Sequence, residues 1–395
     1  MSPMDEVVIL EGARTPLGSF QGSLSSLSAV QLGAAVVKAT LDRSAVDPQQ
    51  VEQIFMGCVL PAGLGQAPAR QAAIGAGLGD HVQASTINKV CGSGMQAAIL
   101  ANDALRVLTA DVIVAGGMES MSNAPYLLAK HRSGARIGHD VVKDSLYLDG
   151  LEDAYESGRL MGSFGEDVAK RYQFSRADQD AYAIASLERA VAAGRSGAFD
   201  RELVPIGVET RSGPQTVAAD EQPLRADPAK IPKLKPAFAP DGTITAANAA
   251  SISDGAAAMV MTRRSIAEQR GWTPSAKVVA HAAHAHEPAL FATAPIFALR
   301  KVLDRAGWRV QDVDLFEINE AFAVVPMAAM QELSIPHEIV NVNGGACALG
   351  HPLGASGARV IVTLIAALKA RDLKRGVASL CIGGGEATAM AVELI

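Results

Sequence analysis

Short, nearly continuous apolar stretches recur along the chain, and their lengths are those of strands. They are rich in Val, Ile and Ala and lie at residues 6–10, 51–57, 110–119 and 376–380. Strands buried on both faces of a sheet have this pattern, whereas half-exposed strands alternate apolar and polar residues. Two other apolar runs, Gln96–Val107 and Ala358–Leu368, have the period of a helix. The pattern predicts an α/β protein in which helices cover both faces of the sheets.

The order of these elements occurs twice in the chain. Residues 6–10 resemble residues 277–281, residues 51–57 resemble residues 313–319, and residues 110–119 resemble residues 376–386. In each half, a glycine-rich turn and a helical run stand between the second and third of these strands. Such an internal repeat indicates one structural unit used twice. We therefore predict two similar strand–helix halves that stack around shared central helices.

Residues 120–241 interrupt the repeat and differ from it in composition. They hold most of the tyrosines, many charged residues and a proline-rich stretch. An amphipathic helix is predicted over Arg176–Ala193, ending at Gly194 because glycine commonly follows the last turn of a helix. The segment is too long and too structured for a linker. We predict an N-terminal half of residues 1–119 plus 242–270, an inserted loop domain of residues 120–241 and a C-terminal half of residues 271–395.

Composition and charge exclude several classes of protein. With 395 residues, 49% of them hydrophobic and 19% charged, the chain is expected to be a globular enzyme rather than a disordered protein. The net charge of −6 argues against nucleic acid as a partner. No apolar run reaches the roughly 20 residues of a membrane span, and residues 1–11 resemble neither a signal peptide nor a transit peptide. We expect a cytoplasmic protein without a membrane partner.

The four cysteines fall into two groups. Four cysteines without Cys-x-x-Cys spacing in a chain of this length predict neither a disulfide framework nor a zinc site. Cys58 and Cys347 lie in apolar or small-residue surroundings, where a cysteine is most often a small buried hydrophobe. Cys91 and Cys381 instead lie in glycine-rich turns. We interpret these two as functional thiols.

A histidine lies in a third turn of the same kind. Cys91 (residues 88–95) and His351 (residues 350–357) directly precede the two helical runs, whereas Cys381 follows the last buried strand. Glycines allow backbone N–H groups to approach a substrate closely. The N-terminus of a helix carries positive charge, which is expected to favour the thiolate of Cys91. Two thiols and one imidazole in such turns indicate acyl chemistry.

The chemistry divides naturally among these groups. His351 can act as the base for Cys91, and the backbone N–H groups of Cys91 and Gly383 can stabilise an oxyanion. A hydrolase needs no second thiol, but Cys381 can move a proton on the carbon next to a thioester. Asn319 follows a buried strand and precedes Glu320 and an apolar run. Asn319 is either the N-cap of a helix, or a side chain that holds a water molecule or orients His351.

Taken together, four segments resemble the signature segments of the thiolases, in the order usual for that family. They are Asn88–Gly94, Asn319–Phe322, Gly350–Pro352 and Cys381–Gly385, and the similarity extends over nearly the whole chain. The resemblance implies a thiolase fold, in which two βαβαβαββ halves form a layered αβαβα arrangement with an inserted loop domain. It also implies a role for each group at the site. Cys91 carries the acyl group, His351 activates it, Cys381 acts as acid and base, and Asn319 holds a water that forms an oxyanion hole with His351.

The resemblance further implies coenzyme A as substrate and product, with no tightly bound cofactor and no metal. The implied contacts to the acyl-CoA are Met161, Lys230, Leu234, Phe238, Ala246, Ala249, Ala250, Ser251, Phe291, Ala321 and Phe322. Three positions depart from the family pattern. Ala250 replaces a usual serine, with Ser251 one position later, Leu160 replaces a histidine common in short-chain members, and Phe291 replaces a methionine that often limits the acyl pocket.

Within the family, the segments at 118–123, 220–223, 233–238 and 245–248 resemble members that make acetoacetyl-CoA. The resemblance therefore implies reversible condensation of two acetyl-CoA molecules through an acetyl-Cys91 intermediate. The alternatives are a broader 3-ketoacyl-CoA thiolase of fatty-acid or branched-chain degradation and a non-catalytic acyl-CoA or lipid-binding protein on the same fold. A ketoacyl synthase is disfavoured, because that chemistry uses two histidines where this chain has one histidine and a second cysteine. The family usually forms dimers or tetramers, which implies a homo-oligomer.

Other signals in the chain indicate no further chemistry. His281, His284 and His286 alternate as on a strand and have a single nearby carboxylate, Glu287, so we predict no metal there. The Gly-x-Gly-x-x-Gly spacing of a dinucleotide site is missing. Ser93 lacks the Gly-x-Ser-x-Gly frame of a serine nucleophile.

Overall fold

Strands from both halves of the chain pair side by side in the computed structural model, which describes residues 5–395. The strand order is β4–β3–β5–β10–β1–β11–β14–β13–β12, with the short β2 (Gly18–Ser19) beside β10. The strands are β1 (Val7–Arg14), β3 (Gln53–Gly57), β4 (Gln83–Ile87), β5 (Val112–Ser120), β10 (Ser253–Arg263), β11 (Ala276–Ala285), β12 (Leu315–Ile318), β13 (Arg375–Ile382) and β14 (Glu386–Leu394). The halves join where Val8 and Ile9 of β1 pair with Lys277 and Ala276 of β11.

The predicted internal repeat is confirmed by the strand pairing. In the first half, β3 runs parallel to β5, which is antiparallel to β10, which is antiparallel to β1. In the second half, β12, β13, β14 and β11 pair in the same directions and in the same order. A parallel bridge from Phe316 to Val340 occupies the place that β4 takes beside β3. The same unit therefore occurs twice, as the sequence predicted.

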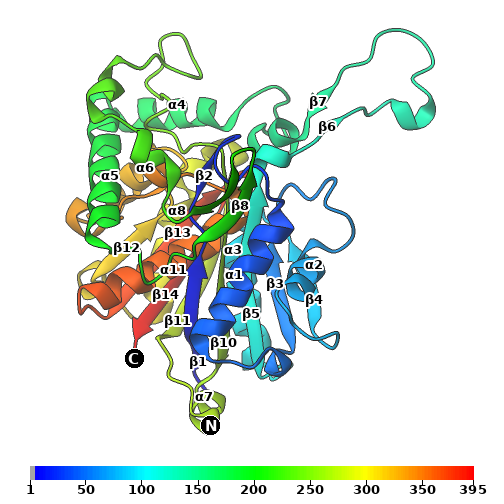
Figure 1. Ribbon diagram of the computed structural model, residues 1–395. Helices are drawn as coiled ribbons and strands as arrows, with labels where there is room; N and C mark the ends of the chain where they lie inside the picture. Colours follow the sequence, from blue (N-terminus) through cyan, green and yellow to red (C-terminus); the bar gives the residue numbers. More distant parts are fainter. Residues whose placement is uncertain (1–4) are drawn as a thin grey trace.

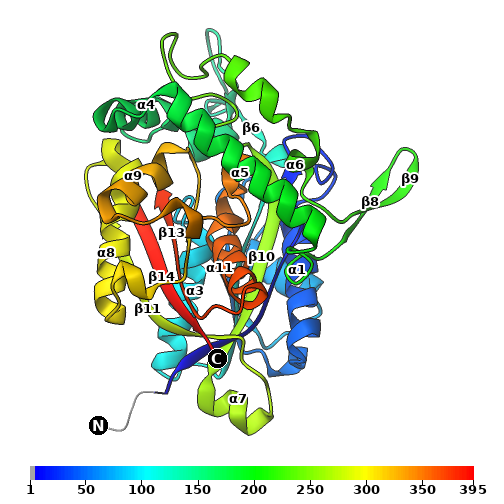
Figure 2. The same ribbon diagram turned by 90° about the vertical axis from the view of Figure 1, so that its left-hand side faces the viewer.

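Helices and sheets alternate in five layers, which Figure 2 shows from α8 on its left to α1 on its right. The central helices α3 (Ser93–Arg106) and α11 (Leu353–Ala370) pack against each other and against strands of both halves. The outer faces are covered by α1 (Ala29–Ser44) and α2 (Pro68–Gly75) on one side and α8 (Ala294–Ala306) on the other, with α9 (Val324–Leu333) packed on α8. The αβαβα arrangement matches the predicted α/β class.

The central helix α11 is the most apolar helix of the described chain. Its 18 residues, with a mean hydropathy of 1.5, pass a length and composition test for a membrane span, but 89% of them are buried inside the protein. All its residues from Leu353 to Leu368 are buried. Burial between two sheets requires apolar residues all round a helix, so the composition follows from its place in the core.

Glycines allow the two central helices to begin very close together. A Cβ at Gly94 would lie 2.7 Å from the backbone nitrogen of Ala358, and a Cβ at Gly357 would lie 2.2 Å from that of Met95. Both distances are far inside van der Waals contact, so only glycine permits this crossing. The Cys91 turn precedes α3 and the His351 turn precedes α11. The close crossing therefore brings the two turns together.

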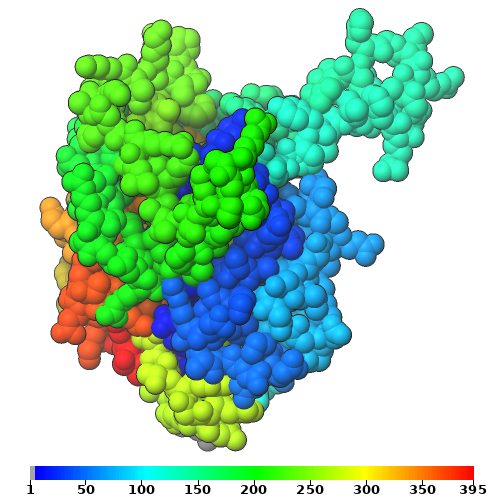
Figure 3. All heavy atoms as spheres, in the orientation of Figure 1, coloured from blue at the N-terminus to red at the C-terminus, as the bar shows by residue number. Residues whose placement is uncertain are grey.

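Residues 120–241 form an arm and a helical part at one end of the layered body and a hairpin that stands out from its side (Figures 1 and 2). Their elements are β6 (Tyr126–Leu127), β7 (Lys143–Asp144), α4 (Met161–Tyr172), α5 (Arg176–Ser196), β8 (Ile206–Thr210), β9 (Gly213–Val217) and α6 (Glu221–Arg225). Two short helices elsewhere are α7 (Arg264–Arg270) and α10 (Ala346–Leu349). The arm around β6 and β7 projects well clear of the body, as Figure 3 shows at its upper right.

The predicted end of α5 is wrong by three residues. The helix continues through Gly194 and ends at Gly197, which has a left-handed φ of 74°. A Cβ at Gly194 would meet nothing within 4 Å, so this glycine lies on an open face of the helix and does not terminate it. The left-handed cap at Gly197 is the position that requires a glycine.

Candidate active site

The turns that hold Cys91, His351 and Gly383 line one apolar pocket. Cys91 lies before α3, His351 before α11, and Gly383 directly after β13. The pocket is lined by Val90, Cys91, Met121, Gly150, Leu151, Met161, Ala250, Ser251, Ile252, Phe291, Ala321, Phe322, His351, Leu353 and Gly383. Three segments far apart in the sequence thus meet around a common space.

The turn before α3 is strained in a way that presents Cys91. Val90 has φ of 46°, in the left-handed region that a β-branched residue rarely adopts. Ser93 holds this turn, because its Oγ accepts from Lys89 N at 2.8 Å and donates to Val90 O at 2.7 Å. Backbone strain of this kind persists where surrounding contacts fix it, often at functional sites. The buried, doubly bonded hydroxyl of Ser93 is a structural group and does not face the pocket as a nucleophile.

Burial sets the ionisation of Cys91. It raises the pKa of the thiol to about 11, although the backbone N–H groups of Gly383 and Cys91 point at the sulfur and lower the pKa. The N–H group of Cys91 at the start of the helix favours the thiolate, as expected, but loss of solvent outweighs this effect in the resting site. Cys91 rests as a thiol that needs a base. The same two N–H groups are positioned for an oxygen bonded to the carbon that Cys91 attacks.

His351 is available as that base. Burial and, to a smaller extent, the positive charge of Arg359 together lower its pKa to about 3, so the imidazole is neutral. Its Nδ1 lies 2.5 Å from Ser356 Oγ, which donates its own hydrogen to Pro352 O at 2.9 Å. Because Ser356 has one hydrogen to give, Nδ1 must donate to it. Nε2 then carries the lone pair that can accept a proton.

Asn319 is not a helix cap, so that alternative is wrong. The next helix, α9, begins at Val324 with Ala323 as its N-cap. The side chain of Asn319 is fully buried instead, with its Nδ2 3.5 Å from His351 Nε2 and its Oδ1 accepting from Arg359 Nη2 at 3.1 Å. Its contacts agree with the other alternative, in which Asn319 orients groups around His351.

Cys381 lies behind the pocket rather than in its wall. Its side chain is fully buried, two residues before the pocket residue Gly383. Burial raises the pKa of Cys381 well above its usual value, and the nearby Cys91 raises it further. The two sulfurs are thus close enough for a charge on Cys91 to oppose the ionisation of Cys381. Cys381 therefore rests as a thiol, as Cys91 does.

Six of the predicted acyl-CoA contacts line this pocket: Met161, Ala250, Ser251, Phe291, Ala321 and Phe322. Two more lie just behind it. The ring of Phe238 stands edge-on to Phe322 at 6.0 Å, and Ala249 forms a bridge with the same phenylalanine. Although Ala250 replaces the usual serine, Ser251 brings a hydroxyl into the pocket wall.

The remaining predicted contacts lie in a second cavity, on the inserted segment. Lys230, Leu234 and Ala246 line it together with Arg225 and Cys347. The loop from Ala246 to Ser251 runs from this cavity to the first pocket, since Ala246 lines one and Ser251 the other. The structure therefore brings the predicted residues into two neighbouring groups along one loop.

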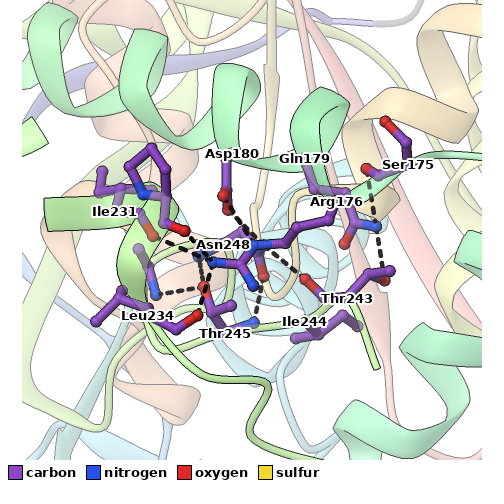
Figure 4. Close-up of polar contacts among 12 residues, drawn as sticks. Ser175, Arg176, Gln179, Asp180, Ile231, Leu234, Thr243, Ile244, Thr245 and Asn248 are labelled. Carbon is purple, nitrogen blue, oxygen red and sulfur yellow. Dashed lines mark hydrogen bonds and ion pairs between the residues drawn. The ribbon is translucent and has the colours of Figure 1, made fainter. Parts of the chain in front are cut away.

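A polar network anchors the loops of the second cavity to α5 (Figure 4). Arg176 Nη2 donates to the carbonyls of Ile231 and Leu234 at 3.2 and 2.8 Å, and Arg176 Nε pairs with Asp180 at 2.8 Å. Asp180 also accepts from Asn248 Nδ2 at 3.2 Å. Both loops that border the second cavity are thus tied to one turn of α5.

Two supports of the site were not predicted. Glu119 at the end of β5 accepts from the backbone N–H groups of Val59, Leu60 and Gly354, at 2.9, 3.1 and 2.8 Å. It thereby ties the start of α11 to the exit of β3, beside Cys91. Lys89 and Glu386 form an ion pair between the Cys91 turn and the strand after Gly383–Gly385. Glu119 and Glu386 both lie within conspicuous sequence motifs, but the residues that they bind are distant in sequence.

The other cysteines and histidines have structural surroundings. Cys58 and Cys347 are buried as predicted, and each sulfur lies 3.7 Å from an oxygen of Glu119 or Glu320. His281 pairs with Asp103, His284 stacks on Phe297, and His286 lies 2.9 Å from a backbone carbonyl. Within residues 5–395, no group of three or more His, Cys, Asp or Glu side chains is arranged to hold a metal ion.

Two family models together match almost the whole chain. The model described as "Thiolase, N-terminal domain" matches residues 7–265, and the model described as "Thiolase, C-terminal domain" matches residues 272–394.

Similar proteins cover the chain from end to end. Acetyl-CoA acetyltransferase of Escherichia coli (strain K12) is 49% identical over 392 residues, which are 99% of each chain. Acetyl-CoA acetyltransferase 2 of Arabidopsis thaliana is 49% identical over 398 residues, covering 100% of this chain and 98% of the relative. The crystal structure of the Bacillus anthracis acetyl-CoA acetyltransferase matches with a TM-score of 0.96 at 38% identity, covering 99% of both chains. The predicted fold is thereby confirmed.

Proposed function

This chain belongs to the thiolase family, and we propose that Cys91 and Cys381 divide the work of its reaction. The chain is an acyltransferase that joins two acetyl-CoA molecules into acetoacetyl-CoA and free CoA, and the reverse reaction is thiolytic cleavage. One observation carries the division of labour. Cys91 lines a pocket together with His351 and Gly383, while the buried Cys381 is close enough to Cys91 for that thiol to raise its pKa.

The first half-reaction acetylates Cys91. His351 Nε2 accepts the proton of the thiol, and the sulfur attacks the carbonyl carbon of the first acetyl-CoA. The oxygen of the tetrahedral intermediate is stabilised by the N–H groups of Cys91 and Gly383, which already point at the sulfur. The bond between the carbonyl carbon and the CoA sulfur then breaks, and the leaving thiolate takes the proton from His351. Acetyl-Cys91 and free CoA result.

The second half-reaction forms the carbon–carbon bond. Once Cys91 is acetylated, Cys381 gives its proton to the neutral imidazole of His351, because an acetylated sulfur no longer opposes its ionisation. The Cys381 thiolate removes a proton from the methyl group of the second acetyl-CoA, and the carbanion attacks the acetyl carbon. The bond to Cys91 breaks and releases the Cys91 thiolate. The Cys91 thiolate takes the proton from His351, and Cys381 keeps the methyl proton, so the starting state is restored.

The two cavities suit the two ends of an acyl-CoA. The first pocket is apolar and holds the reacting groups, whereas the second carries Arg225 and Lys230 at its edge. These cations are exposed and suit phosphate groups of coenzyme A, with Lys233 and Lys235 exposed nearby. We propose that coenzyme A binds as substrate and product along the loop between the cavities. No tightly bound cofactor is required, since thiols, an imidazole and N–H groups supply every step.

The preferred acyl-chain length of the substrate distinguishes an acetoacetyl-CoA thiolase from a broader 3-ketoacyl-CoA thiolase. Phe291 is 3% exposed, packs edge-on to Phe164 and Phe322, and limits the pocket where an acyl chain would extend. We expect kcat/KM for thiolytic cleavage of acetoacetyl-CoA to exceed that for a six- or eight-carbon 3-ketoacyl-CoA by about 10-fold or more, because a filled pocket excludes added methylenes. A steady-state series over chain length measures the ratio. Preference for the longer substrates would replace this assignment with the broader one.

We propose that the chain forms a homo-oligomer, a dimer or tetramer, through the arm around β6 and β7. Ile137, Val141 and Val142 on this arm are 96%, 67% and 56% exposed, which is unusual for aliphatic side chains on a projecting segment. A particle mass in solution equal to the 40.9 kDa of one chain would contradict this.

The four free thiols suit the reducing cytoplasm, where we place the enzyme.

The division into domains is proposed as predicted, with residues 1–119 plus 242–270, 120–241 and 271–395 as its three parts. Residues 1–4 lie outside the described part of the chain. The return of residues 253–263 as β10 between β5 and β1 supports the assignment of 242–270 to the first half. Limited proteolysis within 120–241 that leaves the layered body folded would support the boundaries, and unfolding of the body would contradict them.

A further inference from the structure

A buried arginine holds the side chain of Asn319. Arg359 lies on α11, is 1% exposed, and donates from Nη2 to Asn319 Oδ1 at 3.1 Å. Its Nη1 donates to Glu317 Oε1 at 2.6 Å, and the Glu317 side chain is 2% exposed. Glu317 lies on β12 and Asn319 directly follows that strand. The guanidinium therefore bridges two neighbouring side chains from one strand end.

This contact decides which end of the amide faces His351. A guanidinium group has five N–H donors and no acceptor, so the amide atom that meets Arg359 must be the oxygen. The amide nitrogen then points the other way, and its Nδ2 lies 3.5 Å from His351 Nε2. A reversed amide would set N–H against N–H at Arg359 and present an oxygen to His351. Arg359 thus determines that Asn319 presents its amide N–H, and not its amide oxygen, toward His351.

The donors around the pocket form two sets with separate tasks. The N–H groups of Cys91 and Gly383 point at the Cys91 sulfur and so serve the oxygen of an acyl group bonded there. The groups of Asn319 and His351 are left to stabilise the oxygen of the second thioester. That thioester becomes an enolate when its methyl group loses a proton. An enolate oxygen requires donors, and an amide oxygen in the same place would repel it.

From this arrangement, and on the basis of the proposed function, we propose that Arg359, held by Glu317, is a positioning residue for carbon–carbon bond formation. It keeps the amide N–H of Asn319 directed toward the oxygen of the second acetyl-CoA, either directly or through a water. Burial raises the pKa of Glu317 to about 8. Whether this carboxyl group is ionised or protonated, one oxygen can still accept from Arg359, so the support does not depend on its charge.

Substitution of Arg359 is expected to separate the two half-reactions. In Arg359→Met, the amide of Asn319 loses its fixed partner, and we expect condensation to fall about 10- to 100-fold, the range for a displaced donor. Acetylation of Cys91 is expected to stay within about threefold of the unsubstituted enzyme. Arg359→Lys keeps the charge but can reach one partner at a time. We expect it to give a smaller loss of the same kind, and it decides the question if the Met variant does not fold.

A double-mutant cycle identifies the route of the effect. If Arg359 acts through Asn319, then Asn319→Ala and Asn319→Ala/Arg359→Lys should condense acetyl-CoA at the same rate within about twofold. Acetylation is followed by mass spectrometry of the Cys91 peptide, and condensation by formation of acetoacetyl-CoA. A further loss of condensation in the double variant would overturn the proposal. Equal loss of both half-reactions in Arg359→Lys would also overturn it, because that is the result of a general disturbance.

Arg14 provides a matched control. Its guanidinium is fully buried and pairs with Glu202 and Asp220, but none of its hydrogen bonds reaches a residue that lines the pocket around Cys91. Arg14→Lys should lower the midpoint of thermal unfolding while leaving the ratio of condensation to acetylation unchanged. A changed ratio in this control would show that any buried arginine alters the ratio and would overturn the specific role of Arg359. Failure of the proposed function can be distinguished from failure of this inference, because the unsubstituted enzyme would then form no acetyl-Cys91.

Discussion

Replacement of Cys91 with alanine is expected to abolish both half-reactions. Without the sulfur there is no acceptor for the acetyl group, and no other thiol lines the pocket in the described part of the chain. We expect formation of acetoacetyl-CoA to fall by about 10⁴-fold or more, as for removal of other enzyme nucleophiles. Incubation with acetyl-CoA followed by mass spectrometry of the tryptic peptides should show an acetyl group on Cys91 of the unsubstituted enzyme and none on the variant.

Cys58→Ala is the matched control for this prediction. Cys58 is also a buried free thiol, and its sulfur lies 3.7 Å from Glu119, but burial and that carboxyl group hold its pKa well above the usual range. We expect this variant to be acetylated at Cys91 at nearly the rate of the unsubstituted enzyme. An acetyl group on another residue of Cys91→Ala would move the nucleophile elsewhere. If the unsubstituted enzyme gave no adduct at all, a non-catalytic acyl-CoA-binding protein would be the better description.

The parts of the site that sequence predicted are those whose signal is local. Glycine-rich turns at helix starts and strand ends marked Cys91, His351 and Gly383, and these residues line one pocket. The internal repeat predicted two halves around central helices, which the pairing of β3, β5 and β10 with their counterparts confirms. Both signals depend on neighbouring residues and their spacing. Family resemblance added the assignment of acyl-CoA as substrate.

The parts that sequence missed depend on packing between distant residues. Arg359 lies 40 residues from Asn319 in the chain, and nothing local marks it as a partner. The same is true of Glu119 on β5, which is 235 residues from its partner Gly354 at the start of α11. The sequence indicated that the helix N-terminus favours the Cys91 thiolate, but it could not show that burial would outweigh this effect and raise the pKa of the thiol. Burial is a property of the assembled layers, so it could not be judged from the turn.

Replacement of Cys381 with serine is expected to stop carbon–carbon bond formation while leaving acetylation of Cys91 intact. Serine nearly fills the same buried space, but its hydroxyl is a far weaker acid than a thiol and supplies no base for the methyl proton. We expect condensation to fall about 10²- to 10⁴-fold, the range for loss of a general acid or base. Acetylation should remain within about threefold, because His351 and the N–H groups of Cys91 and Gly383 are unchanged. Exchange of the methyl hydrogens of acetyl-CoA for deuterium in heavy water measures the proton step alone.

Ser379→Ala provides the matched control, two residues earlier on the same strand. Ser379 is fully buried and its Oγ donates to Thr388 O at 2.9 Å, so the variant disturbs β13 and β14 without touching either sulfur. Its condensation and acetylation should fall together or not at all. Equal loss of both half-reactions in Cys381→Ser would assign Cys381 to packing, in line with its complete burial. Normal deuterium exchange with normal condensation would remove it from proton transfer, and the base would have to be sought among the remaining pocket groups, with His351 first.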